Sequence, residues 1–195
     1  MKNVLIIGCG LLGSSLVRRI SKKKIARKIF IYEKSKSNIT KIKKLKLPCT
    51  IVKSLKDDVI NFDLIIFCTP MSEYKKLILK INSFISSKTL ITDIGSSKIE
   101  SSKIINKFLK KGIHWIRSHP ITGSEVSGPE HGKYNMFVDK WCVLIKDKKT
   151  NSRHLKFLNS FWKKVGSKTV IMDSKKHDKI FSITSHLPHL IAYNL

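Results

Sequence analysis

Arginine, alanine and acidic residues are scarce in this sequence of 195 residues, and their scarcity narrows the range of functions. Only five of its 39 basic residues are arginines, and alanine occurs only twice. Aspartate and glutamate together number 13, so the formal net charge is +26. Proteins that bind nucleic acids favour arginine, whose planar guanidinium makes bidentate contacts with phosphates and bases. A compositional bias toward lysine on solvated helix faces therefore explains the charge better than a nucleic-acid interface does.

Long apolar runs and paired cysteines are also absent. No apolar run approaches the ~20 residues of a membrane helix. The four cysteines include no C-x-x-C pair, which favours free thiols in a reducing compartment. Only eight residues precede Cys9, too few for the charged and apolar regions of a secretion signal. We therefore expect a cytoplasmic protein without a membrane partner.

Short apolar runs alternate with lysine-rich segments of helical period between residues 4 and 117. This alternation predicts an α/β fold of the Rossmann type, with a doubly wound, mostly parallel sheet covered by helices on both faces. Residues 118–140 interrupt the pattern with two prolines and three glycines, and so long an irregular segment is commonly functional. We expect strands at 4–7, 28–32, 50–52, 63–68, 89–92, 113–117, 141–145 and 168–172, and helices at 11–21, 39–46, 73–84, 99–111, 153–165 and, broken by Pro188, 174–195.

The segment from Gly8 to Gly13 reads G-x-G-x-x-G between a predicted strand and a predicted helix. That context is typical of dinucleotide-binding turns. Gly8 permits the tight turn, Gly10 lets a pyrophosphate approach the backbone, and Gly13 lets the helix pack closely on the sheet. The N–H groups of Leu11 and Leu12, at the positive end of the helix dipole, would hold the phosphates. The alternative is a glycine-rich turn without a ligand.

Two further residues lie where a dinucleotide site needs them. Glu33 follows the second predicted strand, 20 residues after the last glycine of the loop, where a carboxylate can accept from a ribose 2′-hydroxyl. This favours NAD, although the neighbours Lys34, Ser35 and Lys36 leave NADP open. Thr69 ends the fourth strand at the carboxyl edge of the sheet, where it would line the nicotinamide side or simply terminate the strand.

Three other segments bring histidines and serines to the same edge of the sheet. They are 93–98 (DIGSSK), 118–132 (SHPITGSEVSGPEHG) and 185–189 (SHLPH). Together with the N-terminal GCGLLGSS, these segments resemble the prephenate/arogenate dehydrogenases over the whole chain, and 118–132 is the most specific part. The resemblance implies oxidative decarboxylation of prephenate or arogenate in tyrosine biosynthesis. Hydride passes to NAD(P), and the product is 4-hydroxyphenylpyruvate or tyrosine.

The same resemblance implies a role for individual residues. His119 would act on the hydroxyl proton of the substrate, a task that suits a side chain with a pKa near neutrality. Ser96 would hydrogen-bond the same hydroxyl, and His189 would contact the side-chain carboxylate, with Ser185 and His186 nearby. Against these roles, His119 can be an ordinary loop histidine, and Ser96, like Ser97, can simply cap the following helix.

The resemblance also implies a division of the chain. Residues 1–172 would form the dinucleotide-binding domain, and 173–195 would begin a helical domain that forms a homodimer and completes the substrate site. We expect a full-length protein to be an active dimer and these 195 residues alone to be inactive or nearly so.

Other kinds of function stay open at this stage. The chain can be another Rossmann-fold dehydrogenase of a small acid, or a non-enzymatic protein that binds a dinucleotide or associates with nucleic acid. We predict no metal site, because no carboxylate or cysteine completes a set of ligands around His119 or His131.

Overall fold

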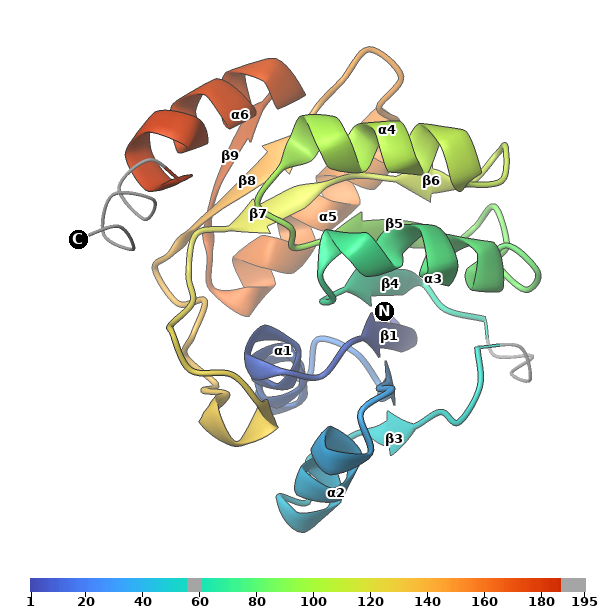
Figure 1. Cartoon of the computed structure of the whole chain (residues 1–195), viewed down its shortest axis with the longest axis vertical. Helices are drawn as coiled ribbons and strands as arrows, with labels where there is room; N and C mark the ends of the chain where they lie inside the picture. The colour runs from blue at the N-terminus through green and yellow to red at the C-terminus, as the bar shows by residue number, and fades with distance from the viewer. Residues whose placement is uncertain (56–60, 187–195) are drawn as a thin grey trace.

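The main sheet of the protein has six parallel strands in the order β3-β2-β1-β4-β5-β6 (Figure 1). The computed structural model describes residues 1–55 and 61–186, with residues 185 and 186 described by their backbone alone. The order reverses between β1 and β4, and ligands of such folds bind outside the carboxyl ends of the strands at this point. The predicted Rossmann fold is confirmed. Its strands are β1 (Asn3–Ile7), β2 (Lys28–Tyr32), β3 (Thr50–Ile51), β4 (Leu64–Phe67), β5 (Leu90–Asp93) and β6 (His114–Trp115).

Helices cover both faces of this sheet (Figure 1). Val4 and Ile6 of β1 pack in one apolar cluster with α1 and α5, whereas Leu5 and Ile7 pack in a second cluster with α3 and α4. Successive strand residues point to opposite faces, so a strand with four consecutive apolar residues is buried on both sides. The helices are α1 (Leu11–Lys22), α2 (Lys36–Lys44), α3 (Tyr74–Ile81), α4 (Lys98–Phe108) and α5 (Ser152–Val165), and a short 3-10 turn, η1 (Met71–Glu73), precedes α3.

A second, three-stranded sheet contains β7 (Ser118–Pro120), β8 (Trp141–Ile145) and β9 (Lys168–Met172). β7 pairs antiparallel with β8, and β9 pairs parallel with it. The strands predicted at 141–145 and 168–172 are therefore present, in a separate sheet. The sequence does not predict β7, because three residues that end at a proline show no alternation. Another 3-10 turn, η2 (Pro129–His131), follows in the connection to β8.

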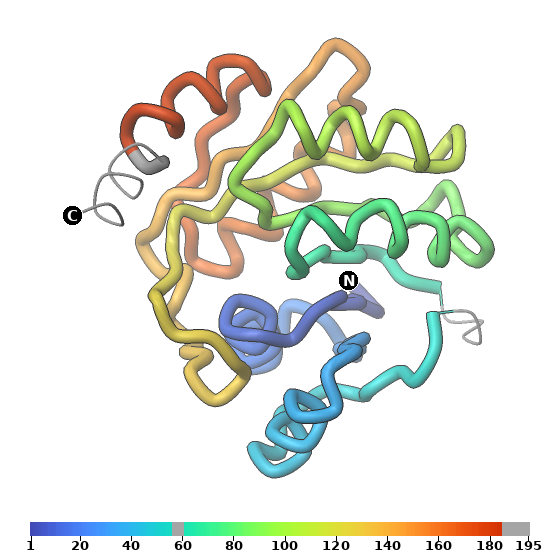
Figure 2. Tube along the Cα trace, in the orientation of Figure 1, coloured from blue at the N-terminus to red at the C-terminus, as the bar shows by residue number. Residues whose placement is uncertain are grey.

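The C-terminal helix starts at Ser174 as predicted but changes its geometry before Pro188, where the sequence predicts the break. α6 (Ser174–Phe181) passes into a π-helical turn, η3 (Ser182–His186). The hydroxyls of Ser182 and Thr184 donate to carbonyl oxygens of the preceding turn, a contact that competes with regular helix geometry. Pro188, where the break was expected, lies outside the described residues. Figure 2 shows α6 beside the start of α4 and the second sheet, which it contacts.

Helix α2 begins three residues earlier than predicted, because the Ser35 hydroxyl accepts a hydrogen bond from the Asn38 N–H and caps it. Within residues 1–55 and 61–186, no helix combines the length and the apolar character needed to cross a membrane.

Candidate active site

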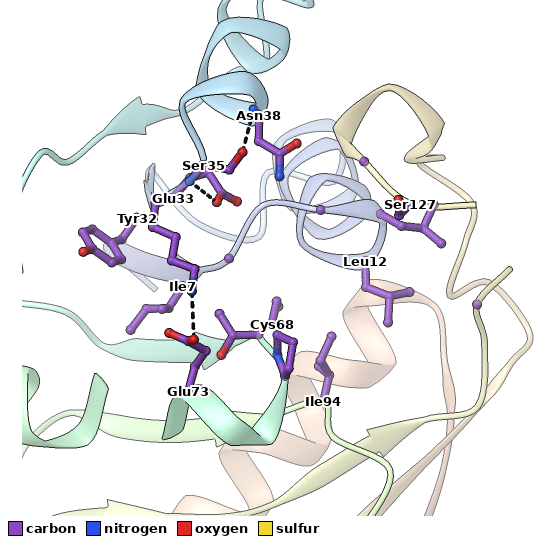
Figure 3. A pocket seen from close by; sticks show the side chains of 18 of the residues that line it. Ile7, Leu12, Tyr32, Glu33, Ser35, Asn38, Cys68, Glu73, Ile94 and Ser127 are labelled. Atoms are coloured by element: carbon purple, nitrogen blue, oxygen red, sulfur yellow. Dashed lines mark hydrogen bonds and ion pairs between the residues drawn. The ribbon is translucent and has the colours of Figure 1, made fainter. Parts of the chain in front are cut away.

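A cavity of about 680 Å³ opens at the carboxyl ends of β1, β2 and β4. Figure 3 shows Glu33 and Asn38 on one side of it and Cys68 and Ile94 on another. The loop from Gly123 to Gly128 contributes a further wall. The cavity therefore lies at the reversal of strand order, where the sequence predicts a dinucleotide.

The glycines of the loop have different surroundings. Gly8 has φ +91°, and a side-chain carbon there would meet the Cys68 carbonyl oxygen at 2.8 Å. A side-chain carbon on Gly13 would overlap the Gly8 carbonyl oxygen, whereas one on Gly10 would meet nothing within 4 Å. Gly8 and Gly13 are thus required by the fold, and Gly10 leaves an open cradle on the cavity wall. Leu11 and Leu12 line the same cavity at the first turn of α1, so their N–H groups suit a phosphate.

Backbone hydrogen bonds hold the carboxylate of Glu33 beside this loop. Its Oε2 accepts from the Cys9 N–H at 2.8 Å, and its Oε1 accepts from the Ser35 N–H at 2.9 Å. A carboxylate has acceptor capacity beyond two bonds, so a ribose hydroxyl can still donate to it.

The two lysines at the mouth of the cavity are paired with acids. Lys34 Nζ lies 2.8 Å from Glu73 Oε1, and Lys41 Nζ lies 2.5 Å from Glu130 Oε1. The hydrogen bond from Lys34 lowers the pKa of Glu73. Neither cation therefore points an uncompensated charge into the cavity.

Thr69 lies on the cavity wall at the end of β4. Its hydroxyl is buried, and it has no hydrogen-bond partner among the described atoms. Buried hydroxyls rarely stay unsatisfied in native proteins. Thr69 thus lies on the wall where a dinucleotide would pass, and its contact with the nicotinamide side stays a prediction.

His119 and Ser96 do not line the cavity, but their neighbours Gly123 and Ile94 do. The two segments that carry them meet at Ser118, whose hydroxyl donates to the Asp93 carbonyl at 2.7 Å. β5 and β7 thus place the predicted hydroxyl-binding serine and the predicted proton acceptor at the same end of the fold.

A buried ion pair supports this junction, and sequence reasoning missed it. Lys98 Nζ lies 2.7 Å from Asp93 Oδ2 and donates to the Ser118 carbonyl at 2.9 Å, and both charged side chains are fully buried. Burial lowers the pKa of Lys98, and the attraction of Asp93 opposes that shift. One signal was available, because a lysine in the first turn of a helix opposes the helix dipole and needs a local anion.

Three residues of α6 lie behind His119, and the sequence does not single them out. His177 is fully buried, and its Nε2 lies 2.9 Å from His119 Nδ1. The Nδ1 of His177 lies 2.7 Å from Asp178 Oδ1. The ring of Phe181 packs against both imidazoles, with centroids 5.0 and 4.6 Å away.

Asp178 also caps α4 from a distance. Its carboxylate accepts from the Lys98 and Ile99 N–H groups at 2.9 and 2.8 Å. Ser97 occupies the N-cap position but makes no capping hydrogen bond with its side chain. Since Asp178 satisfies these donors, the capping alternative for Ser96 and Ser97 loses its support.

The structure describes only some of the residues predicted to bind the substrate. The backbone of Ser185 and His186 lies in the η3 turn, whereas His189 falls outside the described residues. In the part of the chain that the structure covers, no three His, Cys, Asp or Glu side chains gather in a way that could hold a metal ion.

The fold and the glycine loop define a Rossmann-type nucleotide-binding domain. Residues 16–171 match the family model described as prephenate dehydrogenase, nucleotide-binding domain, and the chain belongs to this family. The matched region begins after the glycine loop, so the geometry of that loop is an independent observation.

Curated relatives and solved structures agree with this assignment. The chain is 29% identical to cyclohexadienyl dehydrogenase of Zymomonas mobilis and 32% identical to prephenate dehydrogenase of Lactococcus lactis, with all of this chain aligned in both cases. It covers 66% and 53% of those relatives, and so spans between half and two thirds of their length. The crystal structure of Aquifex aeolicus prephenate dehydrogenase in complex with hydroxyphenyl propionate and NAD+ superposes with a TM-score of 0.91 and 29% identity, over 100% of this chain and 68% of that one.

Proposed function

We propose that this chain forms the NAD-binding and reacting part of an enzyme that oxidatively decarboxylates prephenate or arogenate in tyrosine biosynthesis. The observation that carries the proposal is the glycine-loop cavity beside the His119 segment, in a chain of the prephenate dehydrogenase family. The Aquifex aeolicus relative was crystallised with NAD+ and an aromatic acid, which supports both classes of ligand.

The proposed reaction divides its work between the cofactor and this chain. Bound NAD+ supplies the hydride acceptor. The hydrogen on the hydroxyl-bearing ring carbon leaves as hydride, the ring carboxylate leaves as carbon dioxide, and the ring becomes aromatic. His119 accepts or polarises the hydroxyl proton as the hydride departs, and the phenol oxygen takes that proton back. Ser96 hydrogen-bonds the same hydroxyl and helps to position it.

The cradle fits a dinucleotide and favours NAD over NADP. Gly10 and the first turn of α1 receive the pyrophosphate, and the ribose 2′-hydroxyl donates to Glu33. Of the neighbours that left NADP open, Lys34 is paired with Glu73 and Ser35 caps α2. A 2′-phosphate would therefore meet a fixed carboxylate, and the adjacent Lys34 is already paired with an acid.

The parts of the proposal that concern the whole protein rest on the resemblance alone. His189 would contact the side-chain carboxylate of the substrate, with Ser185 and His186 beside it. Residues 173–195 would begin a helical domain, and the cytoplasmic full-length protein would act as a homodimer.

An assay of the full-length protein with NAD, and with prephenate and arogenate side by side, tests this function through the absorbance of NADH. We expect turnover of at least one substrate. His119→Asn should lower kcat by about 10²–10⁴-fold and leave NAD affinity unchanged. His131→Asn is the matched control, since that exposed histidine lies on η2 and should keep full activity. Turnover of neither substrate, or equal activity of the two variants, would contradict the proposal.

A further inference from the structure

The arrangement behind His119 is a chain of three side chains. His177 stands in the middle. Its Nδ1 lies 2.7 Å from Asp178 Oδ1, and its Nε2 lies 2.9 Å from His119 Nδ1. His177 is fully buried, whereas His119 is half-buried. Of these three side chains, only that of His119 therefore reaches toward the candidate active site.

The protons along this chain follow from the chemistry of its members. A carboxylate only accepts hydrogen bonds, so the Nδ1 of His177 carries a proton toward Asp178. Two N–H groups cannot face each other at 2.9 Å, so one proton lies between the two rings. If His177 held that proton, it would be a cation in a fully buried position, and His119 would carry its own proton on Nε2. If His119 holds it on Nδ1, both rings are neutral and the Nε2 of His119 carries a lone pair.

We infer that His177 and Asp178 are positioning residues that hold His119 in the Nδ1-protonated tautomer, with Nε2 as the atom that accepts the substrate proton. The inference rests on the proposed function of His119. When His119 gains a proton on Nε2, its Nδ1–H continues to donate to His177, and the Asp178 carboxylate stabilises the positive charge through that ring. In an Asp178→Asn variant, the neutral amide would supply no such negative charge.

The fold holds Asp178 firmly enough for this purpose. Its two oxygens accept from consecutive N–H groups at the start of α4, in addition to His177. Burial raises the pKa of Asp178, but the hydrogen bonds from Ile99, His177 and Lys98 outweigh it and leave the pKa lowered. The negative end of the chain is therefore ionised at neutral pH.

The test measures the tautomer of His119 directly by long-range ¹H–¹⁵N NMR of the full-length protein in mildly alkaline buffer without substrate. We expect Nδ1–H in the parent protein. His177→Phe removes the acceptor and should shift His119 toward the Nε2–H tautomer that free imidazoles prefer. His177→Gln keeps an acceptor oxygen and should restore the Nδ1–H form. Asp173→Asn is the control, because it alters the exposed N-cap of the same helix and should leave the tautomer unchanged.

Steady-state kinetics with NAD and prephenate or arogenate give the second readout. His177→Phe should lower kcat by about 10²-fold, with KM for the substrate little changed, and His177→Gln should recover most of the loss. An Nε2–H tautomer in the parent protein, or a Gln variant as impaired as the Phe variant in both readouts, would overturn the inference. Failure of the proposed function can be told apart from failure of this inference. In that case turnover is absent, while the NMR measurement still shows whether His177 and Asp178 hold the tautomer of His119.

Discussion

The two ends of the site are built in different ways. At the cofactor end, two backbone N–H groups hold Glu33: that of Cys9 in the glycine loop and that of Ser35 at the start of α2. At the reacting end, side chains of α6 reach segments far away in sequence. Asp178 accepts from the backbone N–H of Lys98, and His177 Nε2 lies 2.9 Å from His119 Nδ1. A phosphate-binding loop can be formed by the backbone of one short segment. A side chain proposed to accept a proton, such as His119, must instead be oriented by other side chains.

The buried ion pair gives the largest expected effect, and it tests whether the reacting end depends on tertiary contacts. Lys98→Met leaves the Asp93 carboxylate buried without its cation. Removing one member of a buried pair typically costs about 3–5 kcal/mol of unfolding free energy. Urea unfolding of the full-length protein measures this loss.

The matched control for this prediction is Lys103→Met, five residues further along the same helix. Lys103 forms an exposed pair with Glu100, and such pairs contribute little, so no measurable loss is expected. Small and equal losses in both variants would show that the pair beneath Ser118 does not support the reacting end.

Two glycine substitutions test the cofactor end, and their expected effect on stability is intermediate in size. Gly13→Ala introduces a carbon that overlaps the Gly8 carbonyl, and such overpacking costs about 1–3 kcal/mol of unfolding free energy. Gly10→Ala meets no protein atom within 4 Å, so stability should be unchanged.

The second measurement for these glycines is NAD affinity, followed by titration of protein fluorescence. Gly10→Ala should weaken NAD binding by about tenfold, equivalent to roughly 1.4 kcal/mol, because its methyl group occupies the pyrophosphate cradle. A stable Gly10→Ala variant that binds NAD normally would contradict the placement of the pyrophosphate there.

The same contrast explains what the sequence can predict. The glycine loop and Glu33 are predictable because their roles depend on a strand, a turn and a helix that adjoin along the chain. His177, Asp178 and the burial of Lys98 are not, because each depends on a contact with a segment far away in sequence. His119 and Ser96 are intermediate. The resemblance singles them out, but only the structure shows that His119 lies in strand β7 and that Asp178, not Ser96 or Ser97, caps α4.

The smallest expected effect concerns the choice between NAD and NADP. It is tested by comparing Glu33 with Glu73, whose carboxylates lie at the mouth of the same cavity. Glu33→Gln keeps one acceptor oxygen but loses the negative charge that, in the proposed site, would accept from the ribose 2′-hydroxyl and repel a 2′-phosphate. The ratio of NAD affinity to NADP affinity should fall by about tenfold, or roughly 1.4 kcal/mol, which is close to the lower end of the contribution of a hydrogen bond to a charged group. Fluorescence titration with both cofactors in low salt measures this ratio.

Glu73→Gln is the comparison for that change, because it frees Lys34 without altering Glu33. An exposed lysine attracts a phosphate weakly and is screened by salt, so the ratio should shift by a few-fold at most and return toward the parent value in high salt. If Glu73→Gln had the larger effect, the paired lysine would decide cofactor choice. The cofactor end would then depend, like the reacting end, on a contact between distant side chains.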